Sequence, residues 1–261
     1  MTLAASRDSV GATRRRGESN GATFWLTTFL GGNRFTVAPD AAMPSADTIY
    51  PMAFLVEQDP SATVQSHFHQ ADQFQVIVGG SATLAQHPVR DLSVHFAGAY
   101  SPYGPIRATD QGVDYFTLRN GWDPGARYMP GARDTLRAQR RAPHREAVVA
   151  PQPTLSAAEL AGCGAVACDS LIALEEDGLA AWRYRMPPHA GITGPDPRSS
   201  RGQTWLVVGG SLAPPREDSG AAPLPAPSCL FVFPDDAPLA IVAGAEGAEL
   251  LCLQYPRHIE G

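Results

Sequence analysis

Short runs of β-forming residues, separated by turn residues, dominate the first half of the chain after residue 23. Apolar, β-branched and aromatic residues recur within each run, and Gly, Pro, Asp or Asn bounds it. The runs are FWLTTFL (24–30), NRFTV (33–37), IYPMAFLVE (49–57), DQFQVIVGG (72–80), LSVHF (92–96) and DYFTLR (114–119). Many short strands joined by tight turns are typical of a sandwich or barrel. The pattern therefore predicts an all-β protein.

Two segments break this pattern. Residues 1–20 are small, polar and dotted with arginine, so a disordered tail is expected there. Residues 121–155 are rich in Arg and Pro and carry one short helix candidate at 132–141, which indicates a linker. Six arginines fall between Arg127 and Arg145. Because no aromatic platform for bases is interleaved with them, they favour a solvated helix face over a phosphate-binding patch.

The strand pattern returns after Gln152, and the two β regions resemble each other. QFQVIVGGS begins at Gln73 and QTWLVVGGS at Gln203, an offset of 203 − 73 = 130. GVDYFTLR begins at Gly112 and GAELLCLQ at Gly247, an offset of 247 − 112 = 135. Two ordered matches with similar offsets indicate two copies of one domain. We therefore predict one barrel over 21–120 and a second over 156–261.

Composition and charge exclude several classes of function. All 20 positively charged residues are arginine, so a lysine Schiff base is excluded. The net charge of −6 gives no overall attraction to nucleic acid or to an anionic membrane, so neither is an expected partner. The 4 cysteines form no C-x-x-C pair, and no apolar leader or membrane-length apolar run is visible. A cytoplasmic location with reduced thiols is expected.

A histidine motif lies at the centre of the first half. The segment HFHQADQ (67–73), followed by Gly79 and Gly80, resembles the first cupin motif, in which H-x-H precedes an acidic residue and a glycine. The segment PYGPIR (102–107) resembles the second cupin motif, P-x-G-x-x-H. The resemblance implies two tandem cupin-type (jelly-roll) β-barrels joined by a short helical linker.

The resemblance also implies a metal site, from which this chain departs at two positions. In cupins the positions of His67, His69, Gln73 and Arg107 hold a divalent metal such as iron, manganese, nickel or zinc. Here Gln73 replaces the acidic ligand, and Arg107 cannot coordinate because it stays protonated. Three interpretations are open. His67, His69 and Gln73 bind a metal; or the site holds no cofactor and the histidines are polar residues whose hydrogen bonds are satisfied within the barrel; or the site is a metal-free substrate pocket.

The second half has lost the motif. Pro197 and Ser199 stand where the repeat would place the two histidines, and Trp205 stands in the place of Gln75. A large indole at that position is expected to fill the barrel. The second barrel therefore reads as a structural, dimerisation or lid module.

Three functions compete on this evidence. In the first, the N-terminal barrel is a metal-dependent oxygenase or isomerase whose small substrate, expected to be anionic, is clamped by Arg107, with Gln75 and Tyr103 also lining the pocket. In the second, the same pocket binds or senses a small molecule without metal. In the third, the protein is a structural module, with a homodimer as the expected assembly. The residues specify neither reaction nor substrate.

Overall fold

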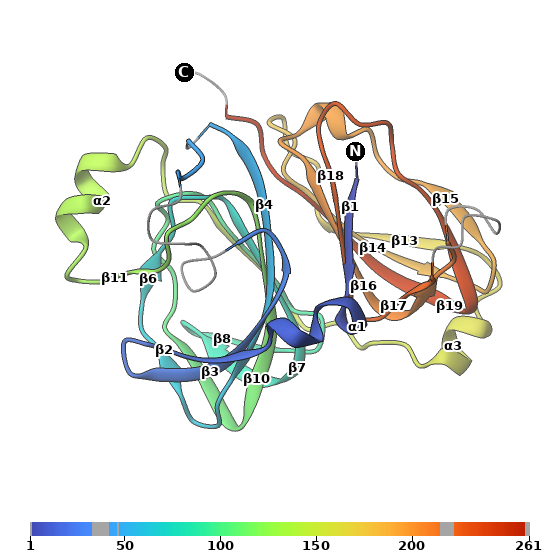
Figure 1. The fold of residues 1–261 in the computed structure, drawn as a ribbon, viewed down its shortest axis with the longest axis horizontal. Helices are drawn as coiled ribbons and strands as arrows, with labels where there is room; N and C mark the ends of the chain where they lie inside the picture. Colours follow the sequence, from blue (N-terminus) through green and yellow to red (C-terminus); the bar gives the residue numbers. More distant parts are fainter. Residues whose placement is uncertain (1, 33–41, 46, 215–221, 259–261) are drawn as a thin grey trace. The chain divides into compact units, whose positions relative to one another are not determined.

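The computed structural model describes residues 2–32, 42–45, 47–214 and 222–258, and the chain divides into two compact units (Figure 1). The first barrel comprises residues 11–153, and the second comprises residues 1–10 together with 154–261. Both are built from antiparallel strands, so the predicted all-β class is confirmed. The predicted strand NRFTV (33–37) lies outside the described residues.

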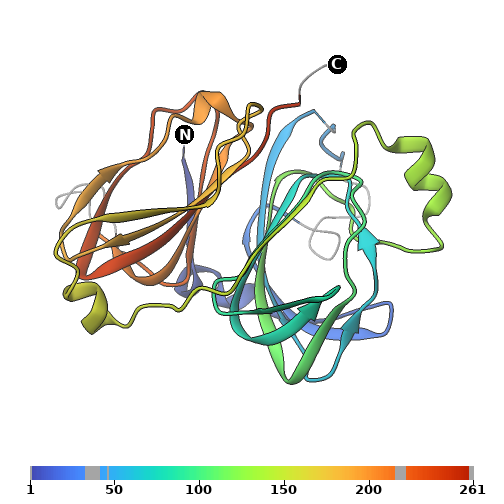
Figure 2. The same cartoon turned by 180° about the vertical axis from the view of Figure 1, so that it is seen from behind.

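The first barrel holds eleven strands, one α-helix and one 3₁₀ turn among the described residues. They are η1 (Gly11–Thr13), β2 (Arg15–Ser19), β3 (Ala22–Leu30), β4 (Ile49–Gln58), β5 (Thr63–Val64), β6 (His67–Phe68), β7 (Gln73–Leu84), β8 (His87–Arg90), β9 (Val94–Ala97), β10 (Ile106–Gly121), β11 (Arg127–Tyr128), α2 (Arg133–Gln139) and β12 (Glu146–Val149). The main sheet has the order β12-β9-β7-β10-β4-β3-β2, and β11 pairs with β6. The two longest strands, β7 and β10, run side by side at its centre (Figures 1 and 2).

The register of β7 against β10 positions the interior residues. Gln73 lies opposite Arg119, and Gln75 lies opposite Thr117. Because side chains alternate between the two faces of a strand, Gln73 and Gln75 share one face, and so do Arg119 and Thr117. The pairing therefore brings two polar side chains of each strand to the same side of the sheet.

The second barrel repeats the order of six strands of the main sheet. Its elements are β1 (Leu3–Ser6), α1 (Arg7–Val10), α3 (Ala157–Ala161), β13 (Ala167–Ile172), β14 (Ala180–Met186), β15 (Gly191–Thr193), η2 (Pro197–Ser199), β16 (Gln203–Leu212), β17 (Leu224–Pro225), β18 (Ser228–Val232) and β19 (Ala240–Gln254). Its sheet order, β1-β18-β16-β19-β14-β13, matches β12-β9-β7-β10-β4-β3 one for one. The pairing of Gln203 with Gln254 corresponds to that of Gln73 with Arg119, at the offsets of 130 and 135. The predicted duplication is confirmed.

The two expected irregular segments are instead part of the barrels. The expected disordered tail at 1–20 contributes β1, which pairs with β18, and β2, which pairs with β3. Strand β1 takes the edge place in the second barrel that β12 takes in the first. The expected linker at 121–155 contributes β11 and β12 to the first barrel. The polar, arginine-rich composition of these segments did not exclude strands, because an edge strand is paired on one side only and its other side is open to water, where such residues are tolerated.

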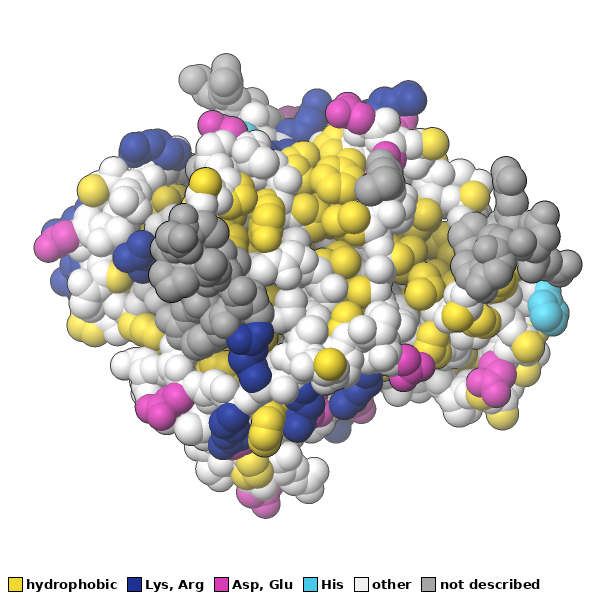
Figure 3. Space-filling model, in the orientation of Figure 1, with side chains coloured by type: hydrophobic (Ala, Val, Ile, Leu, Met, Phe, Trp, Pro, Cys, Tyr) yellow, Lys and Arg dark blue, Asp and Glu magenta, His cyan; other side chains and the backbone are white. Residues whose placement is uncertain are grey.

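Helix α2 lies inside the predicted helical segment 132–141 and outside the sheets of the first barrel (Figures 1 and 2). It buries no residue, and Arg133, Arg137 and Arg141 are exposed. On the face shown in Figure 3, arginine side chains are spread over the surface with acidic side chains among them. This arrangement fits the expected solvated helix face.

The interior of the second barrel is filled by Trp205. The indole is fully buried, stacks on Tyr184 at a centroid distance of 5.5 Å, and donates a hydrogen bond of 3.1 Å to Gln203 Oε1. Pro197 and Ser199 lie on η2 and offer no imidazole. The prediction that a large indole fills this barrel is therefore correct.

No helix in the described part of the chain is long and apolar enough to cross a membrane. The expected cytoplasmic location and the expected homodimer stay predictions.

Strand β1 supplies a matched pair of alanines that tests its place in the second barrel. Ala5 is buried against the sheet and Ala4 is exposed. We expect Ala5→Asn to lower the free energy of unfolding by about 1–3 kcal/mol, the cost of burying an amide without a partner. Ala4→Asn should change it by less than about 0.5 kcal/mol. Urea unfolding of both variants checks this, and equal effects would contradict the assignment of β1 as a packed strand.

Candidate functional site

The first barrel contains a cavity of about 110 Å³ that is open to solvent on one side. Since one water needs roughly 10–15 Å³ measured in this way, the cavity has room for several waters or one small organic molecule. Apolar side chains from alternate positions of β3 and β4 form one wall, and polar side chains from β6, β7 and β10 form the other. The apolar wall includes Phe24, Leu26, Met52, Phe54 and Val56. The cavity is thus apolar over one side and polar over the other.

Five of the six residues expected at the site line this cavity, namely His67, His69, Gln73, Gln75 and Tyr103. The two histidine rings lie 5.1 Å apart, and the ring of His67 lies 4.5 Å from that of Tyr103. The structure therefore brings these five side chains together in one barrel. Their roles as metal or substrate ligands stay predictions.

Arg107 is the exception, and the prediction that it faces into the barrel is wrong. It is the second residue of β10 and is exposed, because its neighbour Ile106 is the buried residue at the start of that strand. The P-x-G-x-x-H match thus holds in sequence but not in side-chain direction. The cation that does line the cavity is Arg119, near the other end of the same strand. Two register shifts lie between these arginines, between Ala108 and Val113 and between Asp114 and Tyr115. Gly80 and Gly112, both at positive φ, lie at the first shift, but glycines alone do not tell which face each arginine takes.

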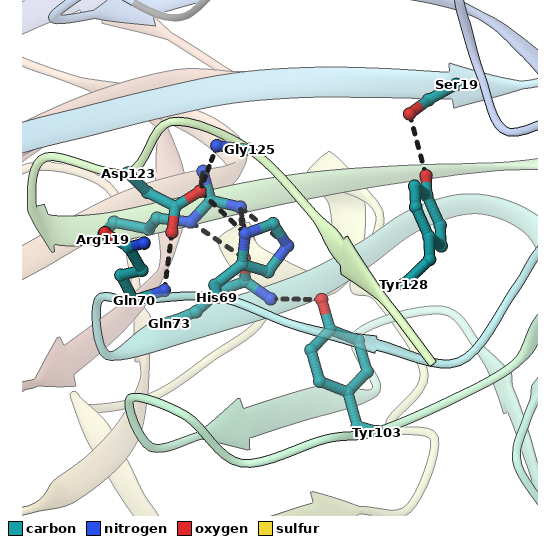
Figure 4. Close-up of polar contacts among 9 residues, drawn as sticks. All are labelled: Ser19, His69, Gln70, Gln73, Tyr103, Arg119, Asp123, Gly125 and Tyr128. Carbon is teal, nitrogen blue, oxygen red and sulfur yellow. Dashed lines mark hydrogen bonds and ion pairs between the residues drawn. The ribbon is translucent and has the colours of Figure 1, made fainter. Parts of the chain in front are cut away.

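The guanidinium of Arg119 occupies the polar end of the cavity and is only 4% exposed. Its Nε and Nη2 donate to Gln73 Oε1 at 2.9 and 2.6 Å, as the β7–β10 register allows (Figure 4). Nη2 also lies 3.1 Å from Nδ1 and 3.2 Å from Nε2 of His69. Nearly equal distances to both nitrogens mean that it contacts the face of the ring rather than one lone pair. The group therefore touches two of the three expected metal-ligand residues.

Asp123 supplies the counter-charge to this buried cation. Its side chain is fully buried, and its Oδ1 lies 3.6 Å from Arg119 Nη1. Oδ1 also accepts from His69 Nδ1 and from the backbone N–H of Gly125, both at 2.7 Å, and Oδ2 accepts from the N–H of Gln70 at 2.7 Å. Burial alone would raise the pKa of Asp123, but His69, Arg119 and these hydrogen bonds hold it well below its usual range. The carboxyl group is therefore ionised at neutral pH.

Arg119 and Asp123 were not among the sequence-predicted site residues. Arg119 ends the run DYFTLR, where it reads as the polar end of a strand, and Asp123 lies in GWDPG, which reads as a turn. The spacing of four residues between the two opposite charges could have indicated an ion pair. The spacing alone does not place either side chain inside the barrel.

Hydrogen-bond logic fixes the direction of the other polar groups. Because an arginine only donates, the atom of Gln73 that faces Arg119 is its carbonyl oxygen. The amide nitrogen then donates to the Tyr103 hydroxyl oxygen at 2.7 Å. Burial raises the pKa of Tyr103, so its hydroxyl keeps a proton, and that proton points away from Gln73. Tyr103, which lines the cavity, is therefore a hydrogen-bond donor there.

His67 is fixed as an acceptor in the same way. Its Nδ1 lies 2.7 Å from the backbone carbonyl oxygen of Gln65, which requires Nδ1 to carry the proton. Burial, with added repulsion from His69 and Arg119, lowers the pKa of His67 to about 3, so the ring is neutral at pH 7. Its Nε2 therefore carries a lone pair.

A second layer holds Gln75 in place. Its Oε1 lies 2.8 Å from Nδ1 of buried His95, whose Nε2 lies 3.1 Å from Glu146 on β12. His95 lies behind Gln75 and lines a smaller adjoining pocket rather than the main cavity. It therefore does not replace a missing metal ligand.

The donor set does not fit a resident divalent metal. Among the described residues, no group of three or more His, Cys, Asp or Glu side chains is placed to hold a metal ion. The carbonyl oxygen of Gln73, which would be the third ligand, accepts two hydrogen bonds from Arg119. A metal bound there would also face that guanidinium at close range, which costs several kcal/mol in a poorly solvated site.

The pairing of Asp123 with Arg119 and His69 predicts a pH-dependent contribution to stability. Asp123→Asn should lower the free energy of unfolding at pH 7 by about 3–5 kcal/mol, because it leaves a buried cation unpaired. The folded-state pKa is lowered below the unfolded value of about 3.9, so the contribution is complete above that value and is lost as pH falls through the folded-state pKa.

Urea unfolding between pH 7 and pH 3 measures this difference. Asp134→Asn, on a side chain that is 97% exposed, is the matched control and should change stability by less than about 0.5 kcal/mol. A loss in Asp123→Asn no larger than the control's would show that the carboxylate is not a required counter-charge.

Comparisons with known proteins agree with the fold. No protein-family model and no curated protein sequence matches the chain. Among solved structures, a candidate dioxygenase from Nostoc punctiforme superposes with a TM-score of 0.62 at 10% identity, covering 100% of this chain and 85% of that one. Pirin from Escherichia coli, solved in complex with nickel(II), gives a TM-score of 0.55 at 8% identity, covering 98% and 100%. Oxalate decarboxylase from Lactobacillus farciminis, solved as a formate complex, gives 0.53 at 12% identity, covering 97% and 86%.

At such low identity the likeness is evidence of fold and not of activity. The matches extend over both barrels of the chain. Together with the repeated order of six strands, they confirm the resemblance stated from the sequence, and the chain has the two-barrel cupin fold.

Proposed function

We propose that the first barrel is a metal-free binding site for a small organic molecule. The observation that carries this proposal is the contact of Arg119 with Gln73 and His69, which places a covalently attached cation where the resemblance implies a metal. The cavity beside that cation has about 110 Å³ of space and opens onto an apolar wall. Concave, mainly apolar pockets with a few fixed polar groups are the usual form of a small-molecule site.

The fixed polar groups define the ligand's hydrogen-bonding pattern. Tyr103 offers a donor and His67 an acceptor, and their rings lie 4.5 Å apart. A ligand that carries an acceptor next to a donor, such as an amide, an undissociated acid or a hydroxy-carbonyl compound, satisfies both. The remainder of the ligand is hydrocarbon in contact with Phe24, Met52 and Phe54.

The charge balance favours a neutral ligand over the anion expected from the sequence. That expectation depended on Arg107, which is exposed. The buried cation Arg119 already faces the buried carboxylate of Asp123, and His67 is neutral at pH 7. With His69 in its neutral form, an added carboxylate would stay without a full counter-charge, which costs several kcal/mol in a buried site.

A series of carboxylates from acetate to benzoate, each paired with its primary amide, tests this proposal by calorimetry at pH 7. At least one amide should bind, and its carboxylate should bind at least tenfold more weakly. Tyr103→Phe should weaken amide binding about threefold to tenfold, the range of one net hydrogen bond. Arg107→Ala, on an exposed arginine of the same strand, is the control and should change nothing.

Tighter binding of the carboxylates would restore the anionic ligand, with Arg119 as its clamp. Binding of neither series would contradict a small-molecule site of this polarity.

The metal-dependent enzyme is the second candidate, because the two-residue spacing of His67 and His69 is retained and pirin, which shares the fold, was solved with nickel(II). Elemental analysis after incubation with nickel(II) or manganese(II) and dialysis separates the two candidates. The metal-free site predicts less than about one tenth of a metal per chain. About one metal per chain, lost in a His67→Ala/His69→Ala variant, would favour the metal-dependent enzyme.

A further inference from the structure

His69 and Asp123 form a buried pair whose geometry serves proton transfer. Asp123 Oδ1 lies 2.7 Å from His69 Nδ1, and the carboxyl group is ionised, so Nδ1 carries the proton that joins them. His69 lines the cavity, and Figure 4 shows its Nε2 directed away from Asp123, towards the space between Tyr103 and Tyr128. A carboxylate that orients an imidazole and stabilises its protonated form is a recurrent way to make histidine a general base.

Other cavity groups are placed to stabilise negative charge that develops on a ligand. The Tyr103 hydroxyl keeps its proton and cannot donate it to Gln73, which is itself a donor to Tyr103. Arg119 lies over the face of His69, so a positive charge borders the space next to the base. Donors that are fixed before the reaction begins stabilise a developing oxyanion more than water does.

We propose that the first barrel catalyses proton transfer at the carbon next to the carbonyl group of a small neutral ketone or aldehyde, with His69 as the general base. The proposal rests on the small-molecule site proposed above and adds an activity to it. Asp123 is the positioning residue of the pair, and Tyr103 is the donor to the carbonyl oxygen.

The step balances without an added reactant. The Nε2 lone pair of His69 takes the proton, the electron pair of the broken C–H bond forms a carbon–carbon double bond, and the carbonyl π pair moves to oxygen. Return of the proton from Nε2 to the opposite face of the same carbon gives racemisation, and return of a hydrogen that Nε2 has taken up from solvent gives exchange. Where the carbon that lost the proton carries a hydroxyl group, return of the proton to the former carbonyl carbon gives an isomer, provided that the hydroxyl proton passes to the former carbonyl oxygen.

Charge conservation explains why this site suits a neutral substrate. With His69 neutral, as a general base requires, the buried charges before the step are Arg119 and Asp123, which cancel. After the step the protonated His69 and the enolate are added, and they cancel as well. Each positive group then has a negative neighbour, because Asp123 contacts His69 and Arg119 while the enolate faces Tyr103 and the guanidinium. No net charge is buried at any stage, which avoids the cost of an unpaired ion.

The test uses the full chain and a panel of 2-butanone, cyclopentanone, hydroxyacetone and dihydroxyacetone. Saturation-transfer NMR first identifies which of them bind. Proton NMR in D₂O then follows the loss of the signal from the carbon next to the carbonyl group. At least one bound compound should exchange faster with the protein than in buffer.

His69→Asn is the decisive variant, because the asparagine amide can donate to Asp123 in place of Nδ1 but offers no basic nitrogen. It should reduce the enzymatic exchange at least about 100-fold, the range for loss of a general base, while binding changes by no more than about threefold. Tyr103→Phe should slow exchange at least about tenfold beyond its effect on binding, and Arg107→Ala should alter neither. His69→Gln serves as a second base-free variant if His69→Asn does not fold.

The outcomes separate the two proposals. Binding without accelerated exchange would overturn the catalytic inference and leave the binding site intact, as would exchange that persists in both His69 variants. If neither these carbonyl compounds nor the amides bind, the proposed binding site fails and the catalytic inference fails with it.

Discussion

The buried guanidinium of Arg119 is the constraint on which the rest of the first barrel depends. A cation that is 4% exposed needs both a counter-charge and acceptors for its N–H groups. Asp123 supplies the charge, and Gln73 accepts two of the hydrogen bonds. From these contacts follow the orientation of the Gln73 amide, the donor role of Tyr103 and the ionised state of Asp123. The same contacts remove the third ligand that a metal would need.

In the second barrel the corresponding strand pair, β16 and β19, has no cation at the position of Arg119. Gln254 takes the place of Arg119 and pairs with Gln203, so two neutral amides satisfy each other at 2.8 Å. Trp205 takes the place of Gln75, donates to Gln203 and fills the interior. In the duplicated fold, one barrel therefore keeps a polar cavity while the other has a packed core. Two pairs of facing residues on strands in the same order contribute to this difference.

The polar groups of the cavity form one connected network. Arg119 orients Gln73, Gln73 orients the hydroxyl of Tyr103, and Asp123 orients His69. Such networks hold side chains in one geometry because every buried donor and acceptor needs its partner. A rigid polar end opposite an apolar wall gives a small ligand a defined orientation, which both selective binding and proton transfer require.

Much of the architecture was determined by local sequence. The alternating runs, the repeat at offsets of 130 and 135, and the motif HFHQADQ were sufficient for the all-β class, the duplication and the two cavity histidines. These features depend on side-chain periodicity and turn residues, which act over a few positions. The size of Trp205 likewise predicted a filled second barrel, because one indole side chain occupies much of the interior of a small barrel.

The identity of the buried cation was decided only by the tertiary structure. Arg107 and Arg119 are both on β10, and the register shifts between them determine which one faces the cavity. The edge strand β1 is a similar case, because its role depends on β18, more than 200 residues away, having an open edge. Register shifts and edge pairing arise from contacts between distant strands. Glycines within a strand can mark where a register shift occurs, but they do not tell which side chain it turns towards the cavity.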